Sequence, residues 1–590
     1  MSQTIFDFIK SEEVNYEEQV ELSDGWSWNM KEHLNRSFAY LNSQFAEDNG
    51  NRWLRPFKNI VLPILNIQFR TEGFDVKDIQ LYADNPDEYF KSLLIQKFHD
   101  KWALENDLDT FIDEMVESYG TYGAALIRKT KQVKPEVINL RSLAFANQFD
   151  LLNNPFAILH KMSFPQLRSE AKLRGWGEAG SDIEIEDLIA LVKKEDRDFV
   201  EVYEVHGSMP VEWMEDDETY DESEMDVNQV QIVAFYMNEQ NERQGVTLFR
   251  KEMPELPFKL IKRDNIYNRA LGRGGVEELF EPQQWTNWDE IWSTEMKQSA
   301  SKTLFASDDP TFKSRNNLNN AQNNEVFKLN QGNQVSQIDT FPRNLGIFND
   351  SIERWQEHAQ QVGAASDPLL GETPSAGTPF KLFEAQQMES KSLHRYRQGK
   401  LAVFMDELYR DWILPHMAKE ISKEQNFMSE LSADEMQMVM DKVVAKKVNN
   451  FKKSMILALQ EVDPALVADL EQVVRADFAK GGNKKFFKIL KDEMKDIDIS
   501  VMTNIAGKQK NLALLTDKLV NVLRQYIATP EIRQDPEMTK VLNVILESSG
   551  LSPVAFGLTP GQAVSQGSNA TQSIKELGQG QLKNQQQSKV

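Results

Sequence analysis

The stretch Gly272-Arg273-Gly274-Gly275 decides the fold, because it opens a run of elements that continues to Glu420. The clustered glycines predict a turn. Residues 275–300 then predict a helix, roughly 39 Å long at ~1.5 Å per residue. An insert, a second helix, a loop and a long helix follow. Two helices flank an insert and a long helix follows them, an order that is typical of a structural element rather than of an active site.

Three tryptophans mark the first of these helices. Trp285, Trp288 and Trp292 stand at positions i, i+3 and i+7, so they share one face. One interpretation is ordinary packing into the core of the chain. The other is an interface, in which the tryptophans anchor the helix against an identical neighbour in a ring.

The insert, residues 301–345, is polar and close to neutral. It holds five Lys or Arg residues against four acids, and thirteen Asn or Gln residues. Residues 325–329 and 334–338 predict short strands. The insert is therefore either a solvated loop or a docking surface, for which the candidate residues are Lys313, Arg315, Lys328 and Arg343.

Three elements complete the run. Residues 347–363 predict a second, shorter helix. Residues 366–378 form a Pro/Gly/Ser-rich loop without Lys or Arg, which is either a bare linker or a mobile segment that approaches a polyanion without binding it tightly. Residues 379–420 predict a helix of roughly 63 Å if it is continuous, and Gly399 and Pro415 are the positions where it can bend.

The flanking sequence is mixed before this run and helical after it. Residues 51–271 alternate predicted helices and strands, and the strands at 199–205, 230–237, 246–250 and 257–261 predict a meander. The run Met214–Asp226 holds eight acids in thirteen residues, which predicts a solvated hairpin tip rather than a divalent-cation site. Residues 425–558 predict helices, with a short strand near 496–501. The chain is thus expected to be an α+β protein, predominantly helical.

Bulk composition excludes several classes of protein. A chain of 590 residues is too long to fold around a single hydrophobic core, so more than one domain is expected. The net charge of −24 argues against a protein that wraps nucleic acid. An acidic wall would instead let DNA slide past without being gripped. The sequence contains no cysteine, so disulfides and Cys-ligated zinc are excluded. The N-terminus lacks the pattern of a secretory signal, and the most apolar run, residues 60–69, is far shorter than the ~20 residues of a membrane span.

Motifs of catalysis are also missing. Seven histidines are scattered without an HExxH pair, and neither a GxxxxGK[ST] loop nor a GxSxG elbow occurs. The turn at 272–275 lacks the GxGxxG pattern. With 91 acids a carboxylate-metal nuclease stays open as an alternative, and so does a helical scaffold or adaptor protein. We expect no enzyme activity, no cofactor and no metal.

Several short segments, in this order, resemble the portal proteins of tailed double-stranded DNA bacteriophages, most closely those of crAss-like phages. The likeness covers roughly residues 50–560. The segments that carry it are Arg55-Pro56-Phe57-Lys58-Asn59-Ile60 with Lys77–Leu81, Glu117-Ser118-Tyr119-Gly120-Thr121-Tyr122-Gly123, Asn153-Asn154-Pro155 before Ala157–Met162, Gly272–Gly275, and His394-Arg395-Tyr396-Arg397-Gln398-Gly399-Lys400. Each segment is weak alone, and the order of parts is the stronger match.

The resemblance implies a subunit with a wing, a stem, a clip, a tunnel loop and a helical crown. The corresponding ranges are an N-terminal arm (1–50), the wing (51–271), stem helix 1 (272–300), the clip (301–345), stem helix 2 (346–364), the tunnel loop (365–378), a long wing helix (379–424), the crown (425–558) and a disordered Gln-rich tail (559–590). The loop residues expected to face DNA are Asp367, Leu369, Leu370, Gly371, Glu372, Ser375 and Gly377.

The resemblance also implies a function and partners. Twelve copies would form a ring at one capsid vertex, nucleate capsid assembly, and pass the genome during packaging and ejection. The implied partners are the major capsid protein, the terminase large subunit, tail or adaptor proteins, and DNA in the channel without sequence specificity. The implied location is the virion, with the host cytoplasm during assembly and no membrane.

Overall fold

The computed structural model divides the chain into two units, Met1–Gly507 and Lys508–Val590. It describes residues 4–23, 25–45, 56–83, 89–130, 134–177, 181–214, 226–238, 240, 242–301, 304–316, 328–338, 345–365, 369, 391–421, 433–458, 462–476 and 499–503. All of these belong to the first unit. The helices predicted after residue 503 and the Gln-rich tail lie outside the described residues.

Helices and strands alternate through the first half of the described chain, and helices dominate the second. The helices are α1 (Ile5–Asn15), α2 (Met30–Leu41), α3 (Val61–Glu72), α4 (Tyr89–Glu105), α5 (Leu108–Tyr122), α6 (Phe164–Arg174), α7 (Ile185–Lys194), α8 (Gly275–Glu278), α9 (Phe280–Ala300), α10 (Phe312–Arg315), α11 (Leu345–Val362), α14 (Ser392–Leu408), α15 (Leu414–Ile421) and α16 (Ala433–Leu457). Short 3₁₀ turns are η2 (Val76–Asp78), η4 (Leu140–Ser142) and η5 (Val211–Trp213), and η7 (Tyr409–Ile413) is π-helical.

The strands form five sheets. They are β1 (Val20–Ser23), β2 (Trp26–Trp28), β3 (Ile79–Ala83), β4 (Ala124–Lys129), β5 (Pro135–Ile138), β6 (Leu143–Phe145), β7 (Phe156–Ser163), β8 (Phe199–Pro210), β9 (Asp226–Met237), β10 (Arg243–Glu252), β11 (Phe258–Lys262), β12 (Leu304–Ser307), β13 (Val335–Ile338) and β14 (Ile499–Thr503). The mixture of helices and strands confirms the α+β class.

The largest sheet has the order β10-β9-β8-β7-β6 and is antiparallel throughout. Helices α6 and α7 pack on it with a core of aliphatic side chains, and α1 packs against β6 and β10. The pair Pro210↔Asp226 closes the β8–β9 ladder, so the acidic run connects two strands that are antiparallel neighbours. Residues 215–225 of that run lie outside the described residues.

The predicted meander ends one strand early. β11 pairs with β4 rather than with β10, in a three-stranded sheet of order β11-β4-β5. The expectation of one continuous meander is therefore wrong for residues 258–262. Packing explains the switch, because Phe258 meets Phe156 of the large sheet edge-to-face at 5.1 Å and fills the core between the two sheets.

The C-terminal part of the described chain returns to the first half. β14 pairs antiparallel with β3, and Val444 and Val448 of α16 lie in the same hydrophobic core as Trp102 of α4. A boundary at residue 425 therefore does not separate an independent helical domain in the described residues. The predicted strand at 496–501 corresponds to β14, which begins at Ile499.

The long helix predicted at 379–420 is helical in its described part, from Ser392 to Ile421. Its middle turn, η7, is π-helical and directly precedes Leu414 and Pro415. Proline lacks an N–H and its ring collides with a carbonyl one turn earlier, so a wider turn before it relieves the clash. Pro415 therefore alters the helix without ending it.

None of the described helices is both long enough and apolar enough to serve as a membrane span.

Candidate functional site, a helical hairpin and its buried base

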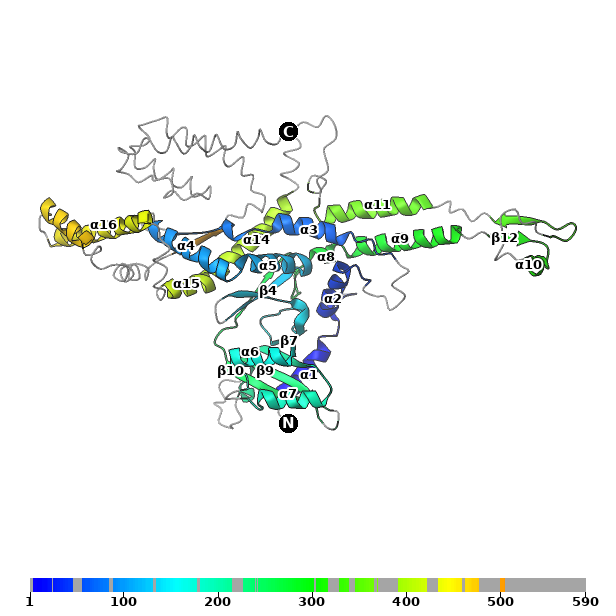
Figure 1. Cartoon of the computed structure of the whole chain (residues 1–590), viewed down its shortest axis with the longest axis horizontal. Coiled ribbons are helices and arrows are strands. Elements are labelled where there is room, and N and C mark those ends of the chain that lie inside the picture. Colours follow the sequence, from blue (N-terminus) through cyan, green and yellow to red (C-terminus); the bar gives the residue numbers. More distant parts are fainter. Residues whose placement is uncertain are drawn as a thin grey trace, which may run out of the picture. The chain divides into compact units, whose positions relative to one another are not determined.

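Helices α9 and α11 form an antiparallel hairpin, in which they lie side by side (Figure 1). Trp285 stacks on Trp355 with ring centroids 6.3 Å apart, and Trp292 meets Phe348 at 6.4 Å. The contacts pair a later residue of α9 with an earlier residue of α11, so the two helices run in opposite directions. The second helix, predicted at 347–363, begins two residues earlier, at Leu345.

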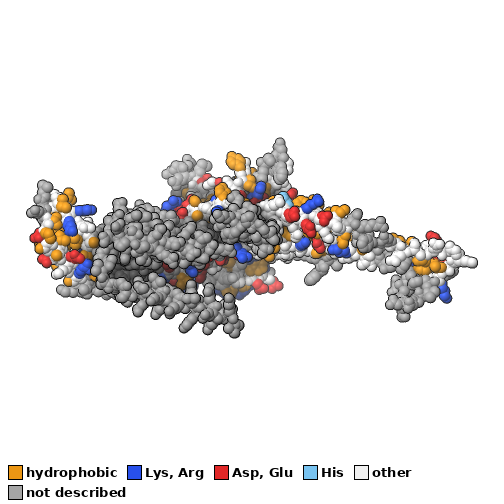
Figure 2. All heavy atoms as spheres, turned by 90° about the horizontal axis from the view of Figure 1, so that it is seen from above, with side chains coloured by type: hydrophobic (Ala, Val, Ile, Leu, Met, Phe, Trp, Pro, Cys, Tyr) orange, Lys and Arg blue, Asp and Glu red, His pale blue; other side chains and the backbone are white. Residues whose placement is uncertain are grey.

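The three tryptophans on α9 are only partly covered by the chain itself. Trp285, Trp288 and Trp292 are 44%, 38% and 39% exposed, and Trp288 lies 5.8 Å from Trp292. Packing against α11 accounts for the buried part of this row but leaves more than a third of each indole in solvent. Figure 2 shows hydrophobic and charged side chains side by side over this part of the molecule.

The first half of α9 is fixed against the start of α3. The Gln283 side chain accepts hydrogen bonds from the Ile60 and Val61 N–H groups at 2.8 and 3.3 Å, and its amide donates to the Lys58 carbonyl at 2.7 Å. Asn287 accepts from the Lys58 N–H at 3.0 Å. The N-cap residue of α3, Ile60, has no side-chain acceptor, so Gln283 of α9 satisfies the Ile60 and Val61 N–H groups, while Asn59 accepts from the Leu62 N–H at 3.0 Å.

A small β module joins the far ends of the two hairpin helices. β12 follows α9 and pairs antiparallel with β13, which precedes α11. Asp309 organises the module, because its carboxylate accepts hydrogen bonds from both the backbone and the side chain of Thr311 and of Asn330, at 2.7 to 2.9 Å. We call residues 304–316 and 328–338 the tip module.

The tip module confirms one predicted strand and places two of the candidate docking residues. The strand predicted at 334–338 corresponds to β13, which pairs with Leu304–Ser307. Of the strand predicted at 325–329, the described residues 328 and 329 are not in a strand. Lys328 is held by a side chain rather than a strand partner, since its N–H and carbonyl bond to the Asn316 amide at 2.9 Å each. Lys313 and Lys328 are both exposed on the module. The Arg315 side chain, Arg343 and residues 325–327 lie outside the described structure.

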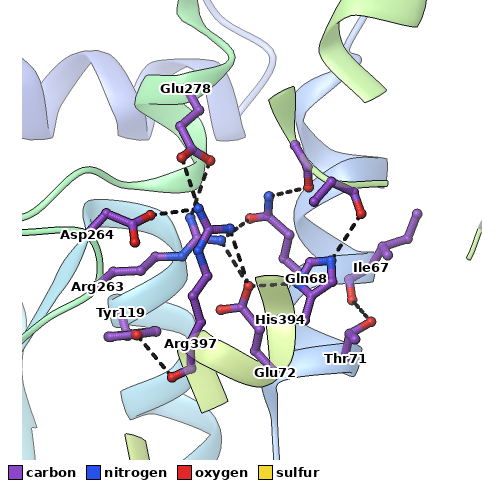
Figure 3. Close-up of polar contacts among 12 residues, drawn as sticks. Ile67, Gln68, Thr71, Glu72, Tyr119, Arg263, Asp264, Glu278, His394 and Arg397 are labelled. Atoms are coloured by element: carbon purple, nitrogen blue, oxygen red, sulfur yellow. Dashed lines mark hydrogen bonds and ion pairs between the residues drawn. The ribbon is translucent and has the colours of Figure 1, made fainter. Parts of the chain in front are cut away.

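The opposite end of the hairpin rests on six buried or half-buried polar residues that we call the base cluster (Figure 3). Its members are Glu72, Arg263, Asp264, Glu278, His394 and Arg397. They come from α3, the end of β11, α8 and α14. The cluster therefore joins the start of the first hairpin helix to the long helix.

Two arginines hold the three carboxylates of the base cluster together. Arg263 Nη2 lies 3.0 Å from Glu72 Oε1, and both side chains are almost completely buried. Arg397 Nη2 lies 2.6 Å from Asp264 and 3.0 Å from Glu278. A guanidinium is planar and carries five N–H donors, so it can serve several carboxylates where a lysine could not.

The base cluster also fixes the end of α11. Gln68, beside Glu72 on α3, donates to the Gly363 carbonyl at 2.9 Å. His394 bridges Glu72 and the Ala364 carbonyl, with its two ring nitrogens at 2.9 and 3.1 Å from those oxygens. Both helices of the hairpin are therefore anchored at one buried point.

Burial and neighbouring charges compete in this cluster, and the charges prevail at Glu72 and Arg397 but not at Glu278. Burial opposes ionisation of Glu72, but Arg263, His394 and Arg397 outweigh it, so the pKa of this carboxyl lies below its ordinary value. For Glu278 burial is the larger effect, and its pKa is raised. Burial also disfavours the charged Arg397, but its carboxylate neighbours raise its pKa above the ordinary value.

The glycine turn packs directly against the end of α5. A Cβ on Gly274 would lie 2.2 Å from the Thr121 carbonyl oxygen, and one on Gly272 would lie 2.6 Å from the Gly123 oxygen. Gly123 itself has φ of +77°, a left-handed conformation that favours glycine. The two glycine-rich segments of the sequence, 119–123 and 272–275, are thus one close backbone contact beside the base cluster.

The loop at 366–378 lies outside the described residues except for Leu369, which is half-buried. The placement of Asp367, Leu370, Gly371, Glu372, Ser375 and Gly377 is therefore still a prediction, as is the helix over 379–390.

Sequence reasoning did not find the base cluster. Arg263 and Glu72 are 191 residues apart, and His394 is 322 residues from Glu72, so no local spacing connects them. The available signal was the one acidic residue of α3, Glu72 at its C-terminal end. Among the described residues no group of three or more His, Cys, Asp and Glu could hold a metal ion.

Comparison with known proteins gives no close relative. No family model matches the chain, and no curated protein matches it significantly. Two similar solved chains are one from the neck of an empty gene transfer agent particle computed with C6 symmetry and one from the virion of a native gene transfer agent particle. They have TM-scores of 0.32 and 0.31 and identities of 8% and 9%, over 73% and 72% of this chain and 98% of each of theirs. Likeness at this level does not establish a shared fold.

Proposed function

We propose that this chain is the portal subunit of a tailed double-stranded DNA bacteriophage, a structural protein rather than an enzyme. Twelve copies would form a ring at one capsid vertex, through which the genome is packaged and ejected. The observation that carries the proposal is the α9–α11 hairpin, anchored at a buried base and joined at its far end by a β module. The order of parts agrees with the order that the sequence resemblance implies.

The tryptophan row favours assembly through the hairpin. An indole covers about 250 Å² of surface, so three that are each about two-fifths exposed present roughly 300 Å² of apolar area. At about 25 cal/mol per Å², covering that area is worth up to about 7 kcal/mol at each contact between copies. A row of this size on one helix is suited to an interface with an identical neighbour.

The hairpin is built to transmit force without changing its own geometry. Its two helices are tied at the base by charged hydrogen bonds and along their length by stacked indoles. A load on the tip module would therefore reach the body of the subunit. We assign the tip module to docking of the terminase large subunit and of tail or adaptor proteins, with Lys313 and Lys328 as exposed contact residues.

The channel assignment rests on charge. The chain carries −24, and the loop 366–378 contains two acids and no Lys or Arg. Such a lining repels DNA phosphates, and salt weakens the repulsion. We assign this loop to the channel wall, where it lets DNA pass without sequence-specific binding, and the major capsid protein to the outside of the ring.

Native mass spectrometry and negative-stain imaging of the purified full chain test the proposal. We expect a single closed oligomer with a central hole. The variant Trp288→Ala/Trp292→Ala should dissociate into folded monomers, whereas Trp355→Phe, which keeps the aromatic pair within the chain, should still assemble. Monomers or rods in the wild-type protein would favour an adaptor or scaffold, and divalent-dependent DNA hydrolysis by monomers would favour a nuclease.

The loop is tested separately by deleting residues 366–378. The deletion should leave the oligomer intact and reduce DNA packaging or retention in reconstituted particles. Loss of the oligomer on deletion would contradict the channel assignment.

A further inference from the structure

An open groove lies between strand β11 and helix α14. The base-cluster residues of this helix, His394 and Arg397, do not line it. The groove has a volume of about 530 Å³ and is lined by Leu260, Lys262, Arg395, Tyr396, Gly399 and Val403, among others. Tyr396 and Val403 are 61% and 60% exposed. Gly399 leaves the groove wide, since a Cβ there would meet no atom within 4 Å.

One wall of the groove is an open strand edge. Among the described strands, β11 is the outer strand of its sheet and has β4 as its one neighbour. The Lys129 N–H bonds to the Pro257 carbonyl at 2.8 Å, and the Arg263 N–H bonds to the Gly123 carbonyl at 2.9 Å. Hydrogen-bonded pairs alternate along an antiparallel ladder, so the odd-numbered residues of β11 bond to β4. Leu260 and Lys262 therefore direct their backbone N–H and carbonyl groups outward, where an extended segment can pair with them.

One end of the groove is cationic, which is unusual in so acidic a chain. Arg395 is exposed and forms no ion pair among the described residues. Lys262 donates to the Arg269 carbonyl at 2.9 Å, and burial lowers its pKa, so a carboxylate beside it would stabilise its charged form. Lys400 lies 4.7 Å from the Tyr396 ring and 3.8 Å from Asp264. At the other end Glu407 faces Lys259 at 4.0 Å.

The chain itself contains a segment of the complementary chemistry. Residues 214–226 hold eight acids and no Lys, Arg or His, together with Met214, Tyr220 and Met225 as apolar side chains. We propose that the groove between β11 and α14 of one copy binds this acidic segment of a second copy, as an extended strand added along β11. Groove and segment are different surfaces, so the contact is heterologous and can link copies head to tail. The proposal does not rest on the channel function, since an assembly of any symmetry could use it.

The probe for this contact is a fluorescent peptide of residues 212–226, measured by anisotropy. A full-chain variant in which residues 215–218 are neutralised (Glu215→Gln, Asp216→Asn, Asp217→Asn, Glu218→Gln) leaves the grooves free. We expect the peptide to bind this variant at least tenfold more tightly than the wild-type protein, whose grooves are occupied. A peptide with every Asp and Glu replaced by Asn and Gln should bind at least tenfold more weakly, and added salt should weaken the acidic peptide.

Two pairs of variants, made in the neutralised background, locate the binding. Gly399→Tyr fills the groove and should abolish binding, whereas Gly399→Ala leaves it open, favours the helix and should keep binding within twofold. Arg395→Glu should weaken binding at least tenfold, whereas Lys391→Glu, outside the groove on the same helix, should have little effect.

Three results would overturn the proposal. The neutral peptide could bind as well as the acidic one, or Gly399→Tyr could leave binding unchanged. The groove of the wild-type protein could also stay occupied after dilution to single copies, which would mean that it binds the acidic segment of its own chain. The proposed function is tested separately, by the mass and the image of the assembled oligomer, and none of these three results would contradict it.

Discussion

Replacing Arg397 by methionine should destabilise the protein by about 3–5 kcal/mol, the usual cost of removing one partner from a buried ion pair. The arginine is 2% exposed and faces Asp264 at 2.6 Å, Glu278 at 3.0 Å and Glu72 at 3.6 Å. Methionine is shorter than arginine but fills a similar volume, so the change removes the charge and the donors with little loss of packing. The carboxylates would then stay buried with Arg263 as their main cation.

The cost should fall in that range because not every carboxylate is stranded. Asp264 is more than a quarter exposed and can turn to solvent, and Glu72 keeps Arg263 and His394. Glu278 is the group most affected, since burial already raises its pKa and Arg397 opposes that effect. We expect the pKa of Glu278 to rise further in the variant, because one of the cations that lower it is lost.

Urea unfolding followed by far-UV circular dichroism measures the loss of stability. The matched control is Arg395→Met, which changes an exposed arginine two residues away and should shift stability by less than about 0.5 kcal/mol. Hydrogen exchange gives the local readout, because the amides of Gly363 and Ala365 at the end of α11 should exchange faster in Arg397→Met alone. Equal stability of the two variants, or unchanged exchange at residues 363–365, would refute a role for the base cluster in holding the hairpin.

Three other predictions follow from the described contacts. Gly274→Ala should cost about 1–3 kcal/mol in the same unfolding assay, because its Cβ would lie 2.2 Å from a backbone oxygen, while Gly346→Ala, with open space, should be neutral or stabilising. Burial lowers the pKa of His33 to about 4, although Glu277 acts in the opposite direction. The free energy of unfolding should therefore fall by about 3 kcal/mol as the pH is lowered from about 6.5 to 4, because the unfolded chain takes up a proton that the folded chain does not. His33→Gln should make the free energy of unfolding less dependent on pH in this range. Trp292→Ala should weaken association in sedimentation experiments, and it should also lower the unfolding midpoint of the monomer, because Trp292 packs on Phe348 at 6.4 Å. Unchanged association at a temperature where the variant stays folded would contradict the interface.

The local elements of this protein are largely readable from its sequence. The strands β8, β9 and β10 contain the residues predicted for them, 199–205, 230–237 and 246–250, and extend beyond those ranges by at most five residues, because glycines and hydrophobic period act over short distances. The hairpin was predictable for the same reason, since its two helices flank a polar insert.

Contacts between distant segments were not readable. β11 follows β10 closely in sequence but pairs with β4, because Phe258 completes a core that only the folded sheets create. β14 pairs with β3 across more than four hundred residues of chain. The base cluster belongs to the same class, since its members come from α3, the end of β11, α8 and α14, and no periodic pattern in the sequence connects them.

The exposure of the tryptophans could not be decided from their spacing. A row at i, i+3 and i+7 describes a buried helix face and an interface face equally well. In the structure Trp285 and Trp292 contact aromatic residues of α11, and Trp288 contacts Trp292. All three indoles are nevertheless partly exposed to solvent.

Electron cryomicroscopy of the assembled full chain tests the central claim most directly, because it locates the α9–α11 hairpin within the oligomer. The account predicts a closed ring in which hairpins of adjacent copies pack through Trp285, Trp288 and Trp292 around a central channel. A closed ring with these indoles facing solvent, or an assembly without a channel, would contradict it.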